Sequence, residues 1–160
     1  MLTPYQLSEN SMSGQFLPFR LDNEIFAIES MYVTAISKML MISPLPGTPE
    51  YCKGIAKVEG KLLPVIDMRL KLRKNCIPYN DETLIIMVNL EGAQSGLIVD
   101  TLAEVLTVSP GCPDGYEECL SKSNPYFKGI IKVNGSPAMV LDCKKILMED
   151  GIFDLAQLVS

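Results

Sequence analysis

The chain has 160 residues, of which 48% are hydrophobic and 21% are charged, which is the composition of an ordered globular protein and not of a disordered one. Its formal net charge of −5 argues against a nucleic-acid partner, because such a partner selects a basic surface. No run approaches the roughly 18 apolar residues of a membrane span, which argues against direct membrane insertion. At this length the chain forms one compact unit or two very small ones.

Residues 1–14 are mostly polar and have neither the basic nor the apolar segment of a secretory signal. We therefore expect a flexible leader there, followed by a single folded domain over residues 15–160. The five cysteines include no C-x-x-C pair; they are Cys52, Cys76, Cys112, Cys119 and Cys143. This pattern is typical of reduced thiols in the cytoplasm and not of a disulfide framework.

Short apolar runs separated by polar turns predict a β-hairpin and a further strand in each half of the chain. The turns of the two hairpins are Asp22-Asn23 and Glu91-Gly92. The strands predicted in this way are Phe16–Leu21, Glu24–Ile28 and Val33–Ile42 in the first half, and Thr83–Leu90, Ser95–Val99 and Glu104–Val108 in the second.

The strongest signal is an internal duplication at an offset of 75 residues. Gly54–Leu72 and Gly129–Leu147 are identical at eight of 19 positions, which indicates two copies of one supersecondary unit. In each copy, two apolar runs flank a two-residue turn, Glu59-Gly60 or Asn134-Gly135. Asn-Gly between apolar runs favours a tight hairpin, because both turn positions need a positive φ. Each copy therefore predicts a second hairpin.

Asp67 and Asp142 follow the repeated strands and are predicted to be helix N-caps and not catalytic acids. About five short strands per half, with no long helix between them, predict a mainly β fold of two small closed barrels. The barrels are expected over about residues 15–80 and 81–147, with a helical tail over 148–160. Because a half of this size buries only a thin core, the two barrels should share apolar surface.

The search for catalytic and metal-binding motifs excludes most enzyme classes. The chain has no histidine, which removes Ser-His and Cys-His catalysis and imidazole metal sites. It contains no glycine-rich phosphate-binding motif, and Cys112 and Cys119 do not have the spacing of zinc ligands. The carboxylates Asp114, Glu117 and Glu118 are interpreted as a solvated loop. We expect no metal and no cofactor, and the residues indicate a binding module and not an enzyme.

Two further patterns have ordinary structural interpretations. The only local basic run has no interleaved aromatic residues and is interpreted as a solvated loop; it consists of Arg69, Lys71, Arg73 and Lys74. Of the nine methionines, Met39, Met41 and Met68 are either core residues, which is the commoner role, or part of an adaptable binding surface.

Three segments, Pro46–Leu72, Gly96–Leu106 and Tyr126–Leu147, resemble the signature blocks of the CheW family of bacterial chemotaxis coupling proteins, in the family's order and spacing. The resemblance covers roughly residues 15–147. It implies two SH3-like five-stranded β-barrels around a shared core, with short helices, and it allows strands to pass between the halves. It also implies a non-catalytic adaptor between the cytoplasmic tips of chemoreceptors and the regulatory domain of a CheA-type histidine kinase. Such a protein is cytoplasmic and is recruited to membrane-associated receptor arrays.

The resemblance also implies a receptor-binding groove, whose candidate residues are Val33, Ala35, Ile36, Gly54 and Glu59. It assigns no kinase-binding residue. Relatives usually have an arginine where this chain has Glu59, and a glutamate where it has Ala35, and often pair the two charges. An exposed pair contributes only about 0–1 kcal/mol, so the fold should tolerate the change, whereas the potential offered to a receptor would differ. Glu59 is therefore either a determinant of receptor choice or a solvated turn residue.

Two alternatives remain beside a chemotaxis adaptor. One is a CheW-like scaffold that couples a different sensor to a kinase outside chemotaxis. The other is a cysteine-dependent enzyme, which would require one thiol of much higher reactivity than the rest.

Overall fold

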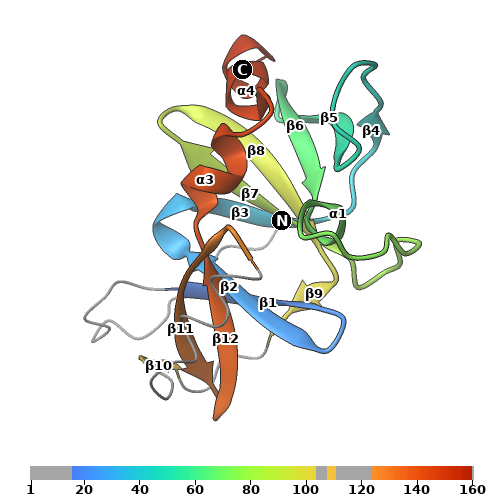
Figure 1. Ribbon diagram of the computed structural model, residues 1–160. Coiled ribbons are helices and arrows are strands. Elements are labelled where there is room, and N and C mark those ends of the chain that lie inside the picture. Colours follow the sequence, from blue (N-terminus) through green and yellow to red (C-terminus); the bar gives the residue numbers. More distant parts are fainter. Residues whose placement is uncertain (1–15, 104–107, 111–123, 160) are drawn as a thin grey trace.

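The computed structural model describes residues 16–103, 108–110 and 124–159, and the fold is mainly β (Figure 1). The strands form two sheets, here called barrel 1, of order β10-β11-β12-β2-β1-β9, and barrel 2, of order β3-β7-β8-β6-β5-β4. Barrel 1 consists of β1 (Phe16–Leu21), β2 (Glu24–Glu29), β9 (Thr101–Leu102), β10 (Val108–Pro110), β11 (Phe127–Val133) and β12 (Ser136–Leu141). Barrel 2 consists of β3 (Val33–Lys38), β4 (Ile42–Ser43), β5 (Cys52–Val58), β6 (Lys61–Asp67), β7 (Leu84–Leu90) and β8 (Ala93–Val99).

The prediction of two small SH3-like barrels with short helices is confirmed, with one short additional strand in each barrel. The additions are the two-residue strands β9 and β4, which lie at the edges of their sheets. The strand expected over Val33–Ile42 is therefore split into β3 and β4. Of the strand expected over Glu104–Val108, residues 104–107 lie outside the described residues. The helical elements are η1 (Ser30–Tyr32), α1 (Met68–Lys71), α3 (Cys143–Met148) and α4 (Ile152–Val159).

Both repeated hairpins are present, and their turns have the backbone that the dipeptides predicted. Glu59 and Gly60 have φ of 50° and 82°, and Asn134 and Gly135 have φ of 51° and 82°. These values fit a two-residue turn in which both central residues are left-handed, and this turn matches the twist of the strands. The Asp67 carboxylate accepts the backbone N–H groups of Arg69 and Leu70, and the predicted caps are confirmed at both helices.

The two barrels do not follow the two halves of the sequence. The hairpin β1–β2 joins the C-terminal hairpin through a parallel pairing of β2 with β12, in which Ile25 lies opposite Ala138. The hairpin β7–β8 joins barrel 2 through a parallel pairing of β8 with β6, in which Gly96 lies opposite Val65. Each barrel is thus built from strands on both sides of residue 80, and the parallel pairs are possible because long connections separate their strands.

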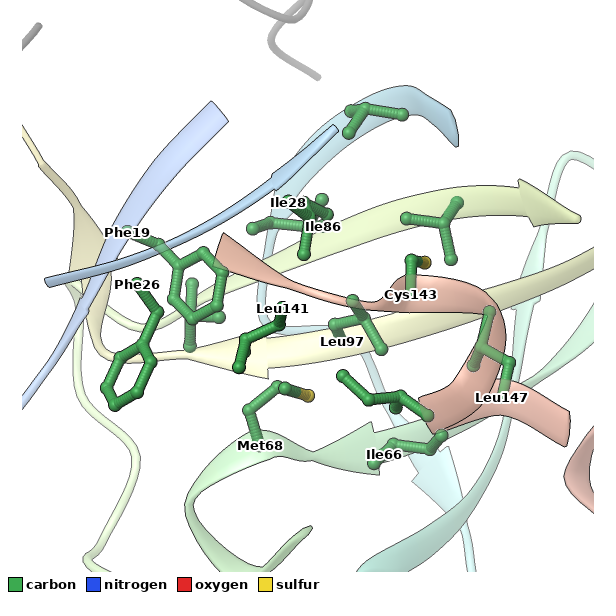
Figure 2. Packing of buried hydrophobic residues seen from close by; sticks show 14 of the residues in the cluster. Phe19, Phe26, Ile28, Ile66, Met68, Ile86, Leu97, Leu141, Cys143 and Leu147 are labelled. Carbon is green, nitrogen blue, oxygen red and sulfur yellow. The ribbon is translucent and has the colours of Figure 1, made fainter. Parts of the chain in front are cut away.

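The largest hydrophobic cluster lies between the barrels and draws on both of them, as Figure 2 shows. Phe19 and Phe26 of barrel 1 pack there with residues of barrel 2, such as Ile86 and Leu97. Separate smaller clusters fill barrel 1 around Val140 and barrel 2 around Leu63 and Val65. The expectation that the barrels share apolar surface is therefore correct, because most of the large buried side chains lie in the shared core.

One interpretation from the sequence is wrong. Arg69 and Lys71, the first two members of the basic run, are buried, with exposed fractions of 6% and 5%. Of the four residues only Arg73 is exposed, as a solvated loop residue would be. The spacing of charged residues along the chain does not show whether distant segments supply carboxylates to pair with them. Arg69 and Lys71 both have such carboxylate partners.

Candidate partner-binding surface

Three of the candidate receptor-binding residues lie on β3, which pairs only with β7 among the strands described. Their side chains are directed largely into the molecule. Ile36 is fully buried and Val33 nearly so, both in the core between the barrels, whereas Ala35 packs inside barrel 2. Ile36 therefore reaches a partner only through the backbone or through a change in packing, and Val33 and Ala35 offer little side-chain surface.

Gly54 on β5 packs against the chain's own backbone. It has a φ of +137°, and a Cβ at this position would lie 2.1 Å from the Ser43 carbonyl oxygen and 2.8 Å from the Pro44 Cα. Glycine is required here because β4 and the following residue approach β5 too closely for any side chain. A bulky substitution at Gly54 would displace β4, so it would test the packing of barrel 2 before it tested a groove.

Glu59 stands at the tip of the β5–β6 hairpin and is exposed. Two lysines of the same hairpin, Lys57 and Lys61, are also exposed. The two lysines outnumber Glu59, so the charge of the hairpin tip is positive on balance. The structure does not bring Glu59 and Ala35 together as an exposed pair, because Ala35 packs inside the barrel.

The exposed residues beside β3 are Met31, Thr34, Lys38 and Met41, of which only Met41 was named from the sequence. We call them the β3 edge surface. Met31 and Met41 have exposed fractions of 76% and 91% and stand just before and just after the strand. Thr34 and Lys38 are the two exposed residues of β3. Methionine adapts its shape to different partners, and so this edge suits a protein contact.

The three methionines named from the sequence have different surroundings. Met68 is fully buried, Met39 is half-buried and Met41 is exposed.

The three cysteines of the described residues differ in burial. Burial raises the pKa of Cys143 to about 12, with smaller contributions from nearby carboxylates, so this thiol stays protonated at neutral pH. Cys52 is also buried, whereas Cys76 is exposed. Within the described part of the chain, no group of three or more Cys, Asp or Glu side chains could hold a metal ion. Cys112, Cys119 and the acidic group Asp114, Glu117 and Glu118 lie outside the described residues.

The sequence model of the CheW-like domain matches residues 15–150. The chain belongs to the CheW-like domain family. The resemblance found in the three signature blocks is thereby confirmed, and with it the assignment to a family of adaptor and scaffold proteins.

Individual relatives of the family span nearly the whole chain. A chemotaxis protein CheW of Treponema pallidum is 27% identical over 157 residues, covering 95% of this chain and 92% of the relative. Protein PilI of Pseudomonas aeruginosa is 26% identical over 159 residues, covering 97% and 86%. The crystal structure of the scaffolding protein TtCheW from Thermoanaerobacter tengcongensis superposes with a TM-score of 0.71 at 25% identity, covering 88% of this chain and 96% of that one.

None of the described helices has the length and apolar character to cross a bilayer.

Proposed function

We propose that this protein is a non-catalytic chemotaxis adaptor that couples the cytoplasmic tips of chemoreceptors to the regulatory domain of a CheA-type histidine kinase. The observation that carries the proposal is the match of the CheW-like domain over residues 15–150, together with relatives named chemotaxis protein CheW that align over nearly their full length. As such an adaptor, the protein acts in the cytoplasm at membrane-associated receptor arrays.

The geometry supports an adaptor because two distinct barrels share one hydrophobic core and each offers its own surface. The receptor tip is a helical hairpin, and an amphipathic helix binds by placing an apolar stripe on a complementary surface. The β3 edge surface supplies exposed Met31 and Met41 for such a stripe. We place the receptor contact there, at the strand whose buried residues include the candidates Val33, Ala35 and Ile36.

The test of the proposal is a reconstitution with the cognate receptor fragment and the kinase regulatory domain. Titration calorimetry should detect binding to each partner, and sedimentation should detect a complex containing all three proteins. Each contact should be no larger than standard size, with micromolar-range affinity, as suits a transient signalling assembly. If the kinase domain does not bind, the chemotaxis proposal fails.

The position of the receptor contact is tested by Met41→Arg, with Met148→Arg as its control. Both methionines are exposed, but Met148 is the last residue of α3 and is not part of the β3 edge surface. Met41→Arg should weaken receptor binding at least tenfold, because it places an unpaired charge in an apolar contact, and should leave kinase binding unchanged. Equal effects of the two substitutions would remove the β3 edge surface as the contact.

Glu59 is proposed to tune receptor choice. Glu59→Arg should weaken binding to the cognate receptor and strengthen binding to a receptor that suits relatives with arginine at this position. Glu91→Arg is a closely matched control, because Glu91 is exposed and occupies the first turn position of another hairpin of barrel 2, with the same φ of 50°. If both affinities are unchanged in Glu59→Arg, this residue is only a solvated turn residue.

A second candidate function is a CheW-like scaffold that couples a different sensor to a kinase outside chemotaxis. The observation in its favour is the match to PilI, which extends over 97% of this chain and carries a name other than CheW. Parallel titration against the regulatory domains of all CheA-type kinases of the same organism separates the two. Selective binding to a kinase that is encoded beside an unrelated sensor would favour the second function.

A further inference from the structure

The basic run that follows β6 connects the two barrels. The helix α1 has only four residues and lies where barrel 2 meets barrel 1 (Figure 1). Its N-cap Asp67 is buried, and the Asp67 carboxylate also accepts a hydrogen bond of 2.6 Å from the Tyr79 hydroxyl. The start of the helix is thus held firmly, and its two buried charged side chains, Arg69 and Lys71, each meet carboxylates from distant parts of the chain.

Arg69 reaches from barrel 2 to the β1–β2 turn of barrel 1. Its guanidinium forms a bidentate pair with Asp100, at 2.7 and 2.5 Å, and a third contact of 2.6 Å with Asp22. Asp22 is the turn residue itself, and its backbone N–H donates to the Asp100 carboxylate at 2.9 Å. Asp100 lies in the segment that leaves β8 of barrel 2 for β9 of barrel 1. One guanidinium therefore ties together three segments, and its side chain is only 7% exposed.

Lys71 makes a second connection on the other side of α1. Its ammonium pairs with Glu149 at 3.0 Å and lies over the rings of Tyr51 and Tyr126, at 4.1 and 4.9 Å from their centres. The two tyrosines lie 75 residues apart, at the offset of the duplication, and directly precede β5 and β11. Lys71 therefore lies between two equivalent tyrosines, Tyr51 of barrel 2 and Tyr126 of barrel 1.

A buried ion pair is a poor means of gaining stability alone, since well-packed apolar residues often do as well, but its geometry is directional. The bidentate fork of Arg69 accepts only a narrow range of positions for Asp100 and Asp22. An apolar contact between the barrels would tolerate sliding far better than this one does.

We propose that Arg69 and Lys71, with Asp22, Asp100 and Glu149, form an interlock that fixes the orientation of barrel 1 relative to barrel 2. The interlock goes beyond the adaptor function, but one consequence rests on that function. If each barrel carries a partner contact, then the interlock also fixes the geometry of the complex that contains both partners.

Spin labels introduced with a bio-orthogonal amino acid at Lys57 and Lys132 would measure the orientation. Both lysines are exposed and are equivalent positions on β5 and β11, so each label reports on one barrel. Arg69→Met should broaden the distribution of distances between the labels at least twofold. Arg73→Met removes an exposed charge two residues after the end of α1 and should leave the distribution as in the wild type.

Asp22→Asn is the second variant, because Asp22 is half-exposed and the Arg69–Asp100 pair remains. The change removes the charge that pairs with Arg69 and, at 3.9 Å, with Lys74. This variant should also broaden the distribution, and it decides the matter if Arg69→Met does not fold. Hydrogen exchange of the strand amides must stay as protected as in the wild type, so that the broadening reports reorientation and not unfolding. A folded Arg69→Met or Asp22→Asn variant with the wild-type distribution would overturn the interlock.

The functional consequence has its own readout. Arg69→Met should bind each partner alone within twofold of the wild type, but should form the complex with both partners at least tenfold more weakly. Failure of the wild type to bind either partner would overturn the proposed function and leave the distance measurement, and thus the interlock, intact. A variant with a broadened distribution of label distances that still assembles the three-protein complex as the wild type does would overturn only this functional consequence.

Discussion

Asp67 and Asp142 cap two helices at equivalent positions of the duplicated unit, and the two helices bury different kinds of side chain. The helix α1 buries two charged residues, Arg69 and Lys71, beside the apolar Met68. The helix α3 buries only apolar residues, among them Ile146 and Leu147. Lys71 and Ile146 are themselves equivalent, 75 residues apart. In both copies the backbone N–H of the capping aspartate donates to a tyrosine carbonyl at 2.8 Å. The local hydrogen bonds were kept while the surroundings of the helices diverged.

The difference shows that a cap and its burial are separate properties. Asp142 binds one backbone N–H of its helix and is half-exposed, whereas Asp67 is buried and binds two N–H groups and the Tyr79 hydroxyl. Around α1, carboxylates from both barrels are present to receive charges; around α3, the shared core is present to receive apolar groups, with Cys143 and Leu147 visible in it in Figure 2.

Truncation of the apolar helix should have the largest effect. Ile146→Ala removes a fully buried side chain from the shared core and should lower the free energy of unfolding by about 2–5 kcal/mol. Leu70→Ala in α1 is the comparison, because Leu70 is only half-buried, and its cost should be smaller. Urea denaturation measures both. Equal losses would show that the two helices contribute alike to the core.

The buried cap should matter more than the half-exposed one. Asp142→Ala should cost about 0.5–2 kcal/mol, the usual effect of losing an N-cap. Asp67→Ala should cost about 1–3 kcal/mol more, because it also leaves the Tyr79 hydroxyl without its acceptor. The double variant with Tyr79→Phe should recover most of this additional cost. A free energy of unfolding that is lowered equally by both Asp→Ala changes would contradict the contrast between the caps.

Making α1 resemble α3 should change the free energy of unfolding little. Lys71→Met introduces an apolar side chain where the other copy has Ile146, and the Glu149 left behind is half-exposed and remains solvated. We expect a change within about 1 kcal/mol in either direction, because a hydrophobic replacement for a buried ion often compensates for its loss. Lys71→Ala, which also removes the packing between Tyr51 and Tyr126, should be clearly worse. A loss of several kcal/mol for Lys71→Met would mean that the charge itself stabilises the fold.

The smallest effect should be a contribution of Asp100 to acid sensitivity. Burial, the largest single influence, opposes ionisation of Asp100, but the hydrogen bonds from Arg69 and the Asp22 N–H and the charges of Arg69 and Lys74 outweigh it, so its pKa is lowered. Such a carboxylate contributes stability above its unfolded pKa of about 3.9, and the contribution is lost as the pH falls through the lowered folded value. Melting temperatures between pH 5 and pH 2 should therefore fall less steeply in Arg69→Met than in Arg73→Met. Parallel curves would show that Arg69 does not set this pKa.

Much of the local structure follows from the sequence. The turn dipeptides Glu59-Gly60 and Asn134-Gly135 predicted both hairpins, since positive φ is a property of a few neighbouring residues. The caps at Asp67 and Asp142 followed from their place at strand ends, since a cap needs only N–H groups two or three residues away. The three signature blocks predicted the family.

The candidate site was predictable only in outline. The sequence placed β3 correctly but not the direction of its side chains, and Ile36 proved to be fully buried. The exposure of Met31 and Met41 gave no signal in the sequence, because methionine is common both in cores and on binding surfaces. For Gly54, the reason for glycine lies 11 positions away along the chain, at Ser43, and became visible only when β4 was placed against β5.

By itself, therefore, the sequence determined what depends on neighbouring residues: strands, tight turns, helix caps and the duplicated unit. The tertiary structure alone decided which strands share a barrel, and so brought Asp22 and Asp100 to Arg69 and brought Tyr51 and Tyr126 to Lys71. The physical reason is that a charged side chain has a place in a protein interior only where counter-charges from other segments meet it, and these meet only when the chain has folded.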